Sequence, residues 1–323
     1  MQISCAFPPA PASVAHVELA ERLGYCRAWF YDSPALYGDV WAVLALAATR
    51  TERIGLGPAV LVPNLRHPLA QASAIATLEQ IAPGRIVIAL GTGFTGRMAM
   101  GQKALPWATV REYVVQLRAL LRGEQVEVDG ALVQMLHNEE FAPKRPIATP
   151  VVVAANGPKG LAVARELGDG VMTIGGGHEE FDWCAALAFG TVLDDGEHPG
   201  SERALAAAGP ALTVVFHGMY EGDPAAVDGL PGGPDWRARI EAFPEPVRHL
   251  AVHEDHLVAV TERDRPLLDG ELLRAFTWTA SRAELRERLA VVEAAGVSEI
   301  LYAPMGPDVP RELHAFAEVG GLV

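Results

Sequence analysis

The feature that most constrains the fold of this chain is the repeated alternation of short apolar runs with segments of helical periodicity. Eight such runs begin near residues 2, 27, 54, 86, 151, 171, 212 and 299. The runs are continuously apolar, as expected of parallel strands that are covered on both faces. Most of them are followed by a helical stripe, so the sequence predicts an α/β fold of eight strand–helix units closed into a (β/α)8 TIM barrel.

Local signals place several of the connecting elements. Ser281–Glu284 and Thr109–Glu112 have the residue types and spacing of capping boxes, so each predicts the start of a helix. Asp129-Gly130 stands between two short stretches of alternating apolar and polar residues, which predicts a β-hairpin.

The length of 323 residues falls within the range of one α/β barrel with insertions. Residues 217–270 do not fit a minimal strand–helix unit, and they contain the turn-forming sequence Pro231-Gly232-Gly233-Pro234. No low-complexity linker and no repeat of solenoid period interrupts the chain. We therefore predict a single domain over 1–323 with an insertion at about 217–270 over the barrel mouth.

Charge and cysteine usage restrict the partners and the location. The formal net charge of −14 disfavours nucleic acid or an anionic membrane as a partner. Cys5, Cys26 and Cys184 are too few and too widely spaced for a disulfide framework or a zinc site, and they suit a reducing compartment. The first twenty residues have no basic segment followed by an apolar one, and no run of about 18 apolar residues occurs. We expect a cytoplasmic protein that acts on a small molecule.

The loop after the run near residue 151 has the features of an anion site. In Asn156-Gly157-Pro158-Lys159 a strand passes into a helix, with Pro158 in the first turn, where its missing amide leaves no hydrogen bond unmade. Free amides and the helix dipole attract a phosphate there. Gly175-Gly176-Gly177 follows the next strand and permits close approach of a ligand. An ordinary helix start is the alternative, but the two loops together predict a phosphate cradle.

Two further strand ends are irregular. The third strand contains glycines and prolines that interrupt its ladder, which predicts a bulge near Pro58–Val60. The bulge either aims groups at a ligand or only turns a barrel corner. Gly91-Thr92-Gly93 lacks the third glycine of a dinucleotide fingerprint, so a Rossmann fold is poorly supported.

Four segments, residues 28–41, 53–93, 154–177 and 285–306, resemble the luciferase-like superfamily and cover a large part of the chain. That superfamily includes bacterial luciferase, FMN-dependent monooxygenases and deazaflavin-dependent oxidoreductases. The segments are most similar to the methylenetetrahydromethanopterin reductase subgroup, whose coenzyme is the deazaflavin F420. The resemblance implies the barrel, F420 or FMN as cofactor, a homodimer, and a non-prolyl cis peptide at Ala59-Val60 behind the central ring of the cofactor.

The resemblance also implies the site residues. The residues expected to contact the cofactor are Ala59, Val60, Asn64, Gly91, Thr92, Gly93, Ala155, Asn156, Gly157, Pro158, Lys159, Gly175 and Gly176. Asp32 and Ser33, after the second strand, are candidate catalytic residues, with helix capping as the alternative for Asp32. Several deazaflavin enzymes have a histidine where this chain has Ser33 and an acidic residue where it has Phe94. Their proton donor is therefore absent, and their reaction does not transfer to this chain.

His253 and His256 in the insertion are the other candidate catalytic residues, because an imidazole exchanges protons near neutral pH. His217 and His178, each placed after a predicted strand, are comparable candidates. A polar turn or a pair of partly buried histidines is the plainest alternative. A metal held by two imidazoles on one helix face is the least favoured interpretation, and we predict no metal.

These features predict an oxidoreductase that transfers a hydride between F420 or FMN and a small organic substrate. The alternatives are an FMN-dependent monooxygenase that uses O2 and a flavin-binding protein without turnover. A phosphosubstrate lyase or isomerase on the same barrel would need a basic group at a strand end, and only Lys159 is near.

Overall fold

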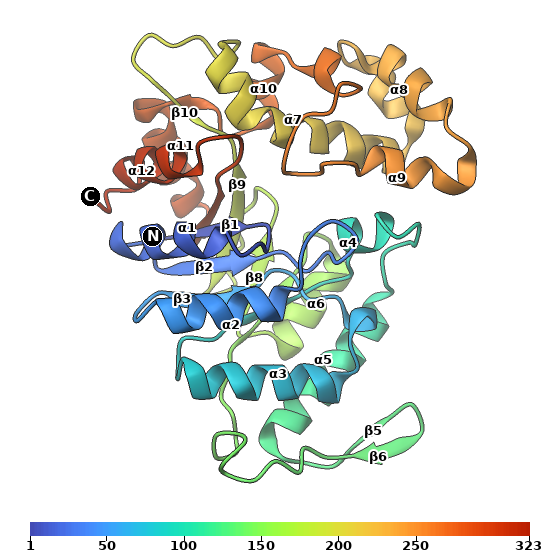
Figure 1. Cartoon of the computed structure of the whole chain (residues 1–323), viewed down its shortest axis with the longest axis vertical. Coiled ribbons are helices and arrows are strands. Elements are labelled where there is room, and N and C mark those ends of the chain that lie inside the picture. Colours follow the sequence, from blue (N-terminus) through green and yellow to red (C-terminus); the bar gives the residue numbers. More distant parts are fainter.

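The central element of the protein, seen in a computed structural model that describes residues 1–323, is an eight-stranded parallel sheet (Figure 1). The strands are β1 (Gln2–Phe7), β2 (Arg27–Phe30), β3 (Gly55–Pro58), β4 (Ile88–Leu90), β7 (Val151–Ala154), β8 (Gly170–Thr173), β9 (Cys184–Phe189) and β12 (Glu299–Ala303). Their order is β3-β2-β1-β12-β9-β8-β7-β4. Parallel bridges from Leu56 to Ile86 and from Leu61 to Leu90 bring the two edge strands together, so the sheet nearly closes into the predicted barrel.

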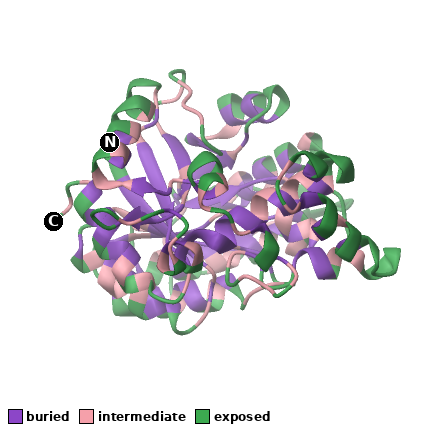
Figure 2. Cartoon of the chain, turned by 90° about the horizontal axis from the view of Figure 1, so that it is seen from above, coloured by how far each residue is buried: buried purple, intermediate pink, exposed green.

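Helices surround this sheet and bury its outer face. They are α1 (Ser13–Arg22), α2 (Val40–Arg50), α3 (Pro68–Ile81), α5 (Trp107–Arg122), α6 (Pro158–Leu167), α11 (Arg282–Ala294) and α12 (Val309–Val319). The short helix α4 (Phe94–Met98) lies in the loop after β4. The strands are buried at the centre of the molecule, and the exposed residues lie on the helices and loops (Figure 2). No helix combines the length and the apolar character needed to cross a membrane.

A group of helices, here called the helical segment (residues 202–276), lies at one end of the barrel (top of Figure 1). It contains α7 (Glu202–Gly222), η2 (Pro224–Gly229), α8 (Gly233–Glu241), η3 (Glu245–Val247), α9 (Arg248–Val252), η4 (Arg265–Leu267) and α10 (Gly270–Phe276). The segment packs around a hydrophobic cluster of its own, in which Trp236 and Phe216 are the largest fully buried side chains. It is therefore held together by apolar burial separate from that of the barrel.

The seventh strand is not where the sequence predicts it. Ala211–Phe216 lies within α7, and the strand is β9 (Cys184–Phe189). A short apolar run is compatible with a strand or with a buried helix, and here Ala211–Phe216 continues the apolar face of a long helix. The strand sequence CAALAF is rich in alanine and has no β-branched residue, so its strand propensity is weak.

Three connecting predictions have different outcomes. The capping box at Ser281–Glu284 is present and opens α11. Asp129 and Gly130 both have positive φ angles and join β5 (Val126–Val128) to β6 (Ala131–Val133), so the hairpin is confirmed. The helix start at Thr109–Glu112 is wrong, because α5 begins at Trp107 and both residues lie inside it. Two remaining short strands, β10 (Val192–Leu193) and β11 (Ala280–Ser281), pair with each other.

Closure of the barrel depends on a close approach of two backbones. A Cβ atom added at Gly57 would lie 2.0 Å from the carbonyl oxygen of Val87. On either side of this contact the amide of Leu56 donates to the carbonyl of Arg85 at 2.8 Å, and the amide of Val87 donates to the carbonyl of Leu56 at 3.1 Å. Only glycine fits at this point of β3.

We expect Gly57→Ala to lower the free energy of unfolding by at least about 2 kcal/mol, because the added methyl group forces the two backbones apart. Urea-induced unfolding followed by circular dichroism measures this change. Gly218→Ala in α7, where an added Cβ meets nothing within 4 Å, is the control and should be neutral or stabilising by up to about 1 kcal/mol. Equal stability of both variants would contradict the proposed role of Gly57.

Candidate functional site

The loops predicted to bind the cofactor all follow the carboxyl ends of barrel strands. Asp32-Ser33 follows β2, Ala59-Val60 follows β3, Gly91 to Gly93 follow β4, Ala155 to Lys159 follow β7, and Gly175-Gly176 follow β8. Asn64 lies in the short helix η1 (Pro63–Leu65). Because parallel strands in a barrel end on the same face, the fold brings these loops to one end, where active sites of such barrels lie.

The peptide bond between Ala59 and Val60 is cis, as the resemblance predicts. Both residues pack against the apolar cluster in the barrel lumen, together with Ala154 from β7 and Leu257 from the helical segment. A Cβ atom at Gly91 would lie 3.1 Å from Val60 Cγ2 and 3.5 Å from Ala154 Cβ. The ends of β3, β4 and β7 therefore meet closely around this peptide.

The N-terminus of α6 offers free backbone amides beside open space. Gly157 is the residue before the helix, and no side chain caps its amides. The side-chain oxygen of Asn156 accepts a hydrogen bond from the amide of Ile174 at 2.8 Å, which ties this loop to the loop after β8. A Cβ atom at Gly157, Gly175 or Gly176 would meet nothing within 4 Å. The two loops thus form a joined, glycine-lined surface that fits a phosphate group.

Asp32 is buried and pairs with an arginine that the sequence patterns did not single out. Nη1 of Arg66 lies 3.1 Å from Oδ1 and 3.2 Å from Oδ2 of Asp32, and Nη2 of the same guanidinium lies 2.5 Å from Oδ2 of Asp39. Asp32 caps no helix. That role belongs to Asp39, which accepts hydrogen bonds from the first amides of α2. One guanidinium therefore bridges a buried and an exposed carboxylate.

The two carboxylates have pKa shifts of opposite sign. Burial raises the pKa of Asp32 above its ordinary value, although the charge and hydrogen bonds of Arg66 oppose this shift. Burial also acts on Asp39, but its hydrogen bonds from Ala42 and Arg66 outweigh burial, and the pKa of Asp39 is lowered. The buried carboxylate is thus the one that holds a proton more readily.

These shifts predict opposite pH dependences of stability. Above about pH 4, Asp32 loses its proton more readily in the unfolded chain than in the folded protein. The stability that its protonated form provides is therefore lost as pH rises through its raised pKa. Asp32→Asn should therefore gain stability relative to the unsubstituted chain between about pH 4 and about pH 7, in urea-induced unfolding.

Asp39→Asn is the matched control for this prediction. A carboxylate with a lowered pKa contributes stability that is present above the unfolded-state value and is lost only at lower pH. Asp39→Asn should therefore be destabilised throughout the same pH range, without a gain as pH rises. Parallel pH profiles for the two variants would contradict the assigned shifts.

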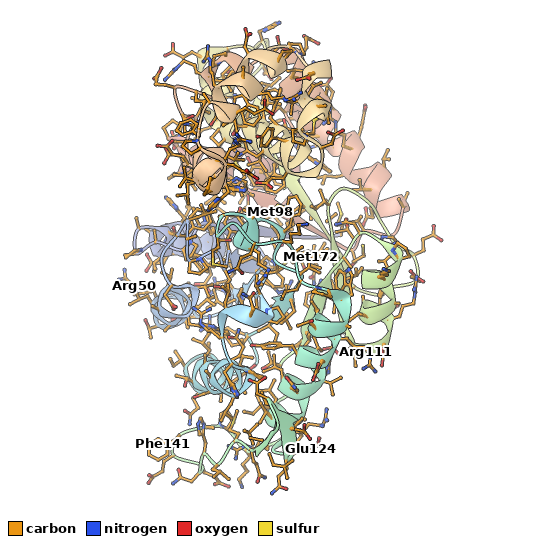
Figure 3. All side chains as sticks on the ribbon, turned by 90° about the vertical axis from the view of Figure 1, so that its right-hand side faces the viewer. Arg50, Met98, Arg111, Glu124, Phe141 and Met172 are labelled. Carbon is orange, nitrogen blue, oxygen red and sulfur yellow. The ribbon has the colours of Figure 1, made fainter.

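Ser33 and Phe94, the two positions at which this chain differs from several deazaflavin enzymes, both lie at α4. Ser33 is buried, and a Cβ atom added at Gly96 of α4 would lie 3.3 Å from its hydroxyl oxygen. Phe94, the first residue of α4, is 48% exposed. Met98, on the same helix, faces the helical segment (Figure 3). The loop after β4 therefore packs over the loop after β2 and toward the helical segment.

The candidate histidines of the insertion meet in the interior of the helical segment. His253 directly follows α9, and His256 lies in the next turn, so they do not share a helix face. Both are 3% exposed and converge with His217, which lies in α7 and not after a strand. Burial lowers the pKa of His217 and of His256. The backbone carbonyl of His256 accepts a hydrogen bond from the hydroxyl of Tyr37 at 2.5 Å, which connects this cluster to the loop after β2.

Arg66, Tyr37 and His217 have structural roles at this site that sequence reasoning did not assign. Asp39 directly precedes a helical run, which is a signal for a helix cap. The guanidinium that joins Asp39 to Asp32 comes from a separate loop, and no local pattern predicts this contact. His217 was misplaced because the run before it was interpreted as a strand. Only the tertiary contacts bring these side chains to their partners.

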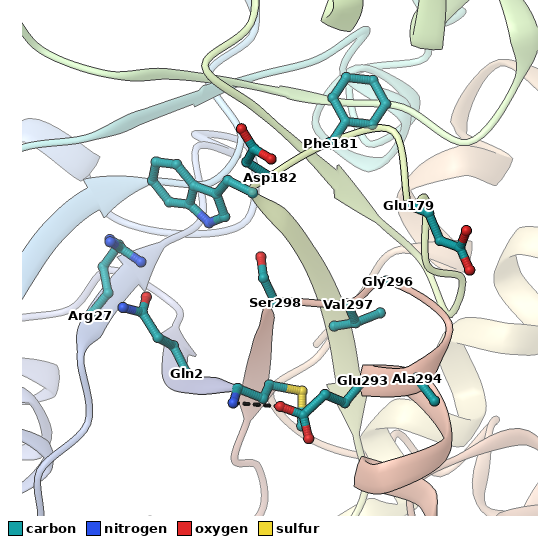
Figure 4. Close-up of a pocket in the computed structure, with 12 residues that line it drawn as sticks. Gln2, Arg27, Glu179, Phe181, Asp182, Glu293, Ala294, Gly296, Val297 and Ser298 are labelled. Carbon is teal, nitrogen blue, oxygen red and sulfur yellow. Dashed lines mark hydrogen bonds and ion pairs between the residues drawn. The ribbon is translucent and has the colours of Figure 1, made fainter.

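A hollow of about 940 Å³ lies at the opposite end of the barrel (Figure 4). It is lined by the starts of β1 and β2, at Gln2 and Arg27, and by Ser298 before β12. Because residues at this end of such barrels serve stability and not catalysis, the chemistry of the fold lies at the other end. The candidate site is therefore the loop cluster at the carboxyl ends of the strands.

The sequence pattern of the luciferase-like monooxygenase family matches residues 5–188, which is more than half of the chain. The chain belongs to this family. The match begins within β1, contains β2 to β8 and all but the last residue of β9, and includes every predicted cofactor loop.

Two curated proteins are similar to this chain, one over nearly its whole length and the other over about half of it. The 5,10-methylenetetrahydromethanopterin reductase of Archaeoglobus fulgidus is 27% identical over 320 residues, which cover 93% of this chain and 91% of that protein. The F420-dependent glucose-6-phosphate dehydrogenase of Beutenbergia cavernae is 34% identical over 200 residues, 56% of this chain and 59% of that protein. The second match therefore spans less than two thirds of that relative.

Solved structures show the same fold. An F420-dependent tetrahydromethanopterin reductase from Methanopyrus kandleri superposes with a TM-score of 0.70 at 20% identity, covering 98% of this chain and 97% of that one. A type II Baeyer-Villiger monooxygenase from Pseudomonas putida in complex with FMN gives 0.64 at 15% identity, covering 100% and 98%. The predictions of a luciferase-like barrel and of an oxidoreductase are confirmed, and F420 and FMN are the two cofactors found among these relatives.

Proposed function

We propose that the chain binds F420, or FMN in its place, at the carboxyl ends of the barrel strands and transfers a hydride between this cofactor and a small organic substrate. The observation that carries the proposal is the joined pair of loops after β7 and β8. Gly157, Gly175 and Gly176 leave open space there beside the free amides of α6. A cofactor phosphate fits such a surface, and Lys159 in the first turn of α6 adds a positive charge.

F420 is favoured over FMN by the relatives. The reductase of Archaeoglobus fulgidus matches this chain over nearly its whole length, and the glucose-6-phosphate dehydrogenase of Beutenbergia cavernae is F420-dependent. The FMN complex of the Baeyer-Villiger monooxygenase supports the alternative, an FMN-dependent monooxygenase that uses O2. Transfer of a hydride is the chemistry that a bound deazaflavin supplies.

The residues of this chain would bind, orient and exclude water. The loops after β3, β4, β7 and β8 would position the cofactor, with Ala59-Val60 against its ring. Leu257 packs on the same lumen cluster as Ala59 and Val60, so the helical segment, proposed here as an insertion in a single domain, would cover the substrate. Asp32 would hold its carboxyl group at the edge of this space, oriented by Arg66.

Substitution of Gly176 by valine tests the cradle. The added side chain would occupy space that is open in the protein, so Gly176→Val should fold normally and bind F420 at least about tenfold more weakly, as a bulky group displaces the phosphate. Gly229→Val is the matched control, because its added Cβ also meets nothing within 4 Å but lies in η2, outside the site. Fluorescence quenching during titration with F420, and absorbance with FMN, measure the affinities.

Failure of the unsubstituted chain to bind either cofactor below the millimolar range would refute the proposal. Turnover of the reduced cofactor with and without O2 distinguishes the remaining functions. Oxidation that needs only an organic acceptor indicates hydride transfer, and dependence on O2 indicates a monooxygenase. Binding without turnover by any tested substrate class indicates a flavin-binding protein.

We also propose that the chain is a homodimer in the cytoplasm. The segment that follows α5 carries exposed apolar side chains far from the helical segment, where Phe141 is labelled in Figure 3. Leu132, Leu136 and Phe141 are between 62% and 83% exposed. Large exposed apolar side chains on one segment are the kind of surface that a protein interface buries.

Leu136→Glu should convert the dimer into monomers, because a charge would be buried at the interface. Light scattering coupled to size-exclusion chromatography measures the mass. Val291→Glu, at an exposed position of α11, is the control and should leave the mass unchanged. A monomeric unsubstituted chain at micromolar concentration would contradict the dimer.

A further inference from the structure

Three histidines of the helical segment point their ring nitrogens at one another in a buried space. Nδ1 of His256 lies 3.3 Å from Nδ1 of His217 and 3.3 Å from Nδ1 of His253. One ligand atom of each residue lies within 4.8 Å of those of the other two, and all three residues are nearly fully buried. His253 and His256 follow α9, and His217 reaches them from α7.

Hydrogen bonds among the rings do not account for this arrangement. Nε2 of His253 lies 3.2 Å from Oε1 of Glu221, and Nε2 of His217 lies 3.7 Å from Oδ1 of Asp264. Glu221 is at hydrogen-bond distance from Nε2 of His253, whereas Nε2 of His217 is too far from Asp264 for a hydrogen bond. A ring that carries its one proton on Nε2, facing its carboxylate, keeps a lone pair on Nδ1. Nδ1 of His256 has at most one proton and can satisfy only one of these two lone pairs. Nε2 of His256 has no hydrogen-bond partner at all.

Two of the three separations match those of ligands around a single metal ion, and the third, between His217 and His253, lies within 4.8 Å. Zinc binds imidazole nitrogens at about 2.0–2.1 Å in a tetrahedron, which places neighbouring ligand atoms about 3.3–3.4 Å apart. The two Nδ1–Nδ1 distances of 3.3 Å equal this edge length. A cation at the centre would accept all three lone pairs and remove the conflict among the rings.

The groups behind the rings also suit a cation. Metal-bound histidines usually donate their second N–H to a carboxylate or carbonyl, which fixes the tautomer. Glu221 stands in this position behind His253 at hydrogen-bond distance, and Asp264 lies 3.7 Å from Nε2 of His217, outside hydrogen-bond distance. Asp264 is held in place by Trp236 Nε1 at 2.7 Å and by the Thr261 hydroxyl at 2.8 Å. The two carboxylates would also balance the charge of a divalent ion.

We propose that His217, His253 and His256 bind one divalent transition-metal ion through their Nδ1 atoms, with zinc as the first choice. Three imidazoles and no sulfur or carboxylate ligand suit zinc and exclude magnesium or calcium, which prefer oxygen. Three protein ligands leave the fourth position of the tetrahedron to a water molecule.

The site has an access route and a place in the architecture. A groove of about 570 Å³ between the loop after β2 and α9 is lined by His253, together with Leu36 and Leu250. The residue after His256, Leu257, packs on the lumen cluster of the barrel, and the carbonyl of His256 accepts the hydrogen bond of Tyr37. A metal bound here would fix the turn that holds the helical segment over the barrel mouth.

The test is metal binding by the full chain, without a polyhistidine tag and without cofactor. After treatment with a chelator, zinc is titrated in competition with a chromophoric chelator, and bound metal is counted by mass spectrometry. We expect one equivalent with a Kd below about 1 µM, a rise of Tm on loading, and the absorption of tetrahedral Co²⁺ when cobalt replaces zinc. Weaker binding or an octahedral cobalt spectrum overturns the proposal.

Variants separate this site from other histidines and from misfolding. His256→Gln should abolish binding, whereas His249→Gln, a histidine on α9 outside the cluster, should not change it. Glu221→Gln keeps all three ligands and should weaken binding by about 10–100-fold with an unchanged circular dichroism spectrum. Retention of full affinity in both His256→Gln and Glu221→Gln overturns the site. Gly176→Val should bind zinc normally, so failure of the cofactor site and failure of the metal site are distinguishable.

Discussion

Closure of the barrel by the contact between Gly57 and the carbonyl of Val87 is the constraint on which the remaining structure depends. The edge strands β3 and β4 are not joined by a long ladder but by a few bridges around this contact. Once they meet, the chain leaves β3 at Ala59 and returns to β4 at Leu61, so the cis peptide and the loop after β4 lie side by side. The position of the candidate cofactor site thus follows from how the sheet closes.

The two ends of the barrel divide stability from function. At the end where strands begin, Glu299 is fully buried and accepts hydrogen bonds from the indoles of Trp29 at 3.2 Å and Trp183 at 2.9 Å, beside Arg27. A buried carboxylate is tolerated only with such partners. At the other end the loops carry glycines with open space beside them. The first arrangement holds strands together, and the second leaves room for a ligand.

The helical segment connects these loops to a second buried polar cluster. Its own apolar core makes it a stable cover, and Leu257 and Tyr37 link it to the barrel. Buried polar groups stay in a fold when their hydrogen-bonding capacity is met. Asp264 meets this condition through Trp236 and Thr261, whereas the rings of His217, His253 and His256 do not meet it among themselves. Within one segment, the carboxylate is therefore satisfied by its neighbours and the three rings are not.

The barrel, seven of its eight strands and the loops that carry the candidate cofactor residues were all predictable from the sequence. Each of them depends on local periodicity and on glycine and proline within a few positions. The sequence also determined the helix start at Pro158 and the cis peptide through the resemblance. The helical conformation of Ala211–Phe216 is apparent only in the tertiary structure. The choice between a strand and a buried helix depends on which elements pack against these residues. The tertiary structure likewise decided that Arg66 pairs with Asp32 and that His217 joins His253 and His256. Those contacts unite residues more than 30 positions apart, and no local pattern encodes the distance between them.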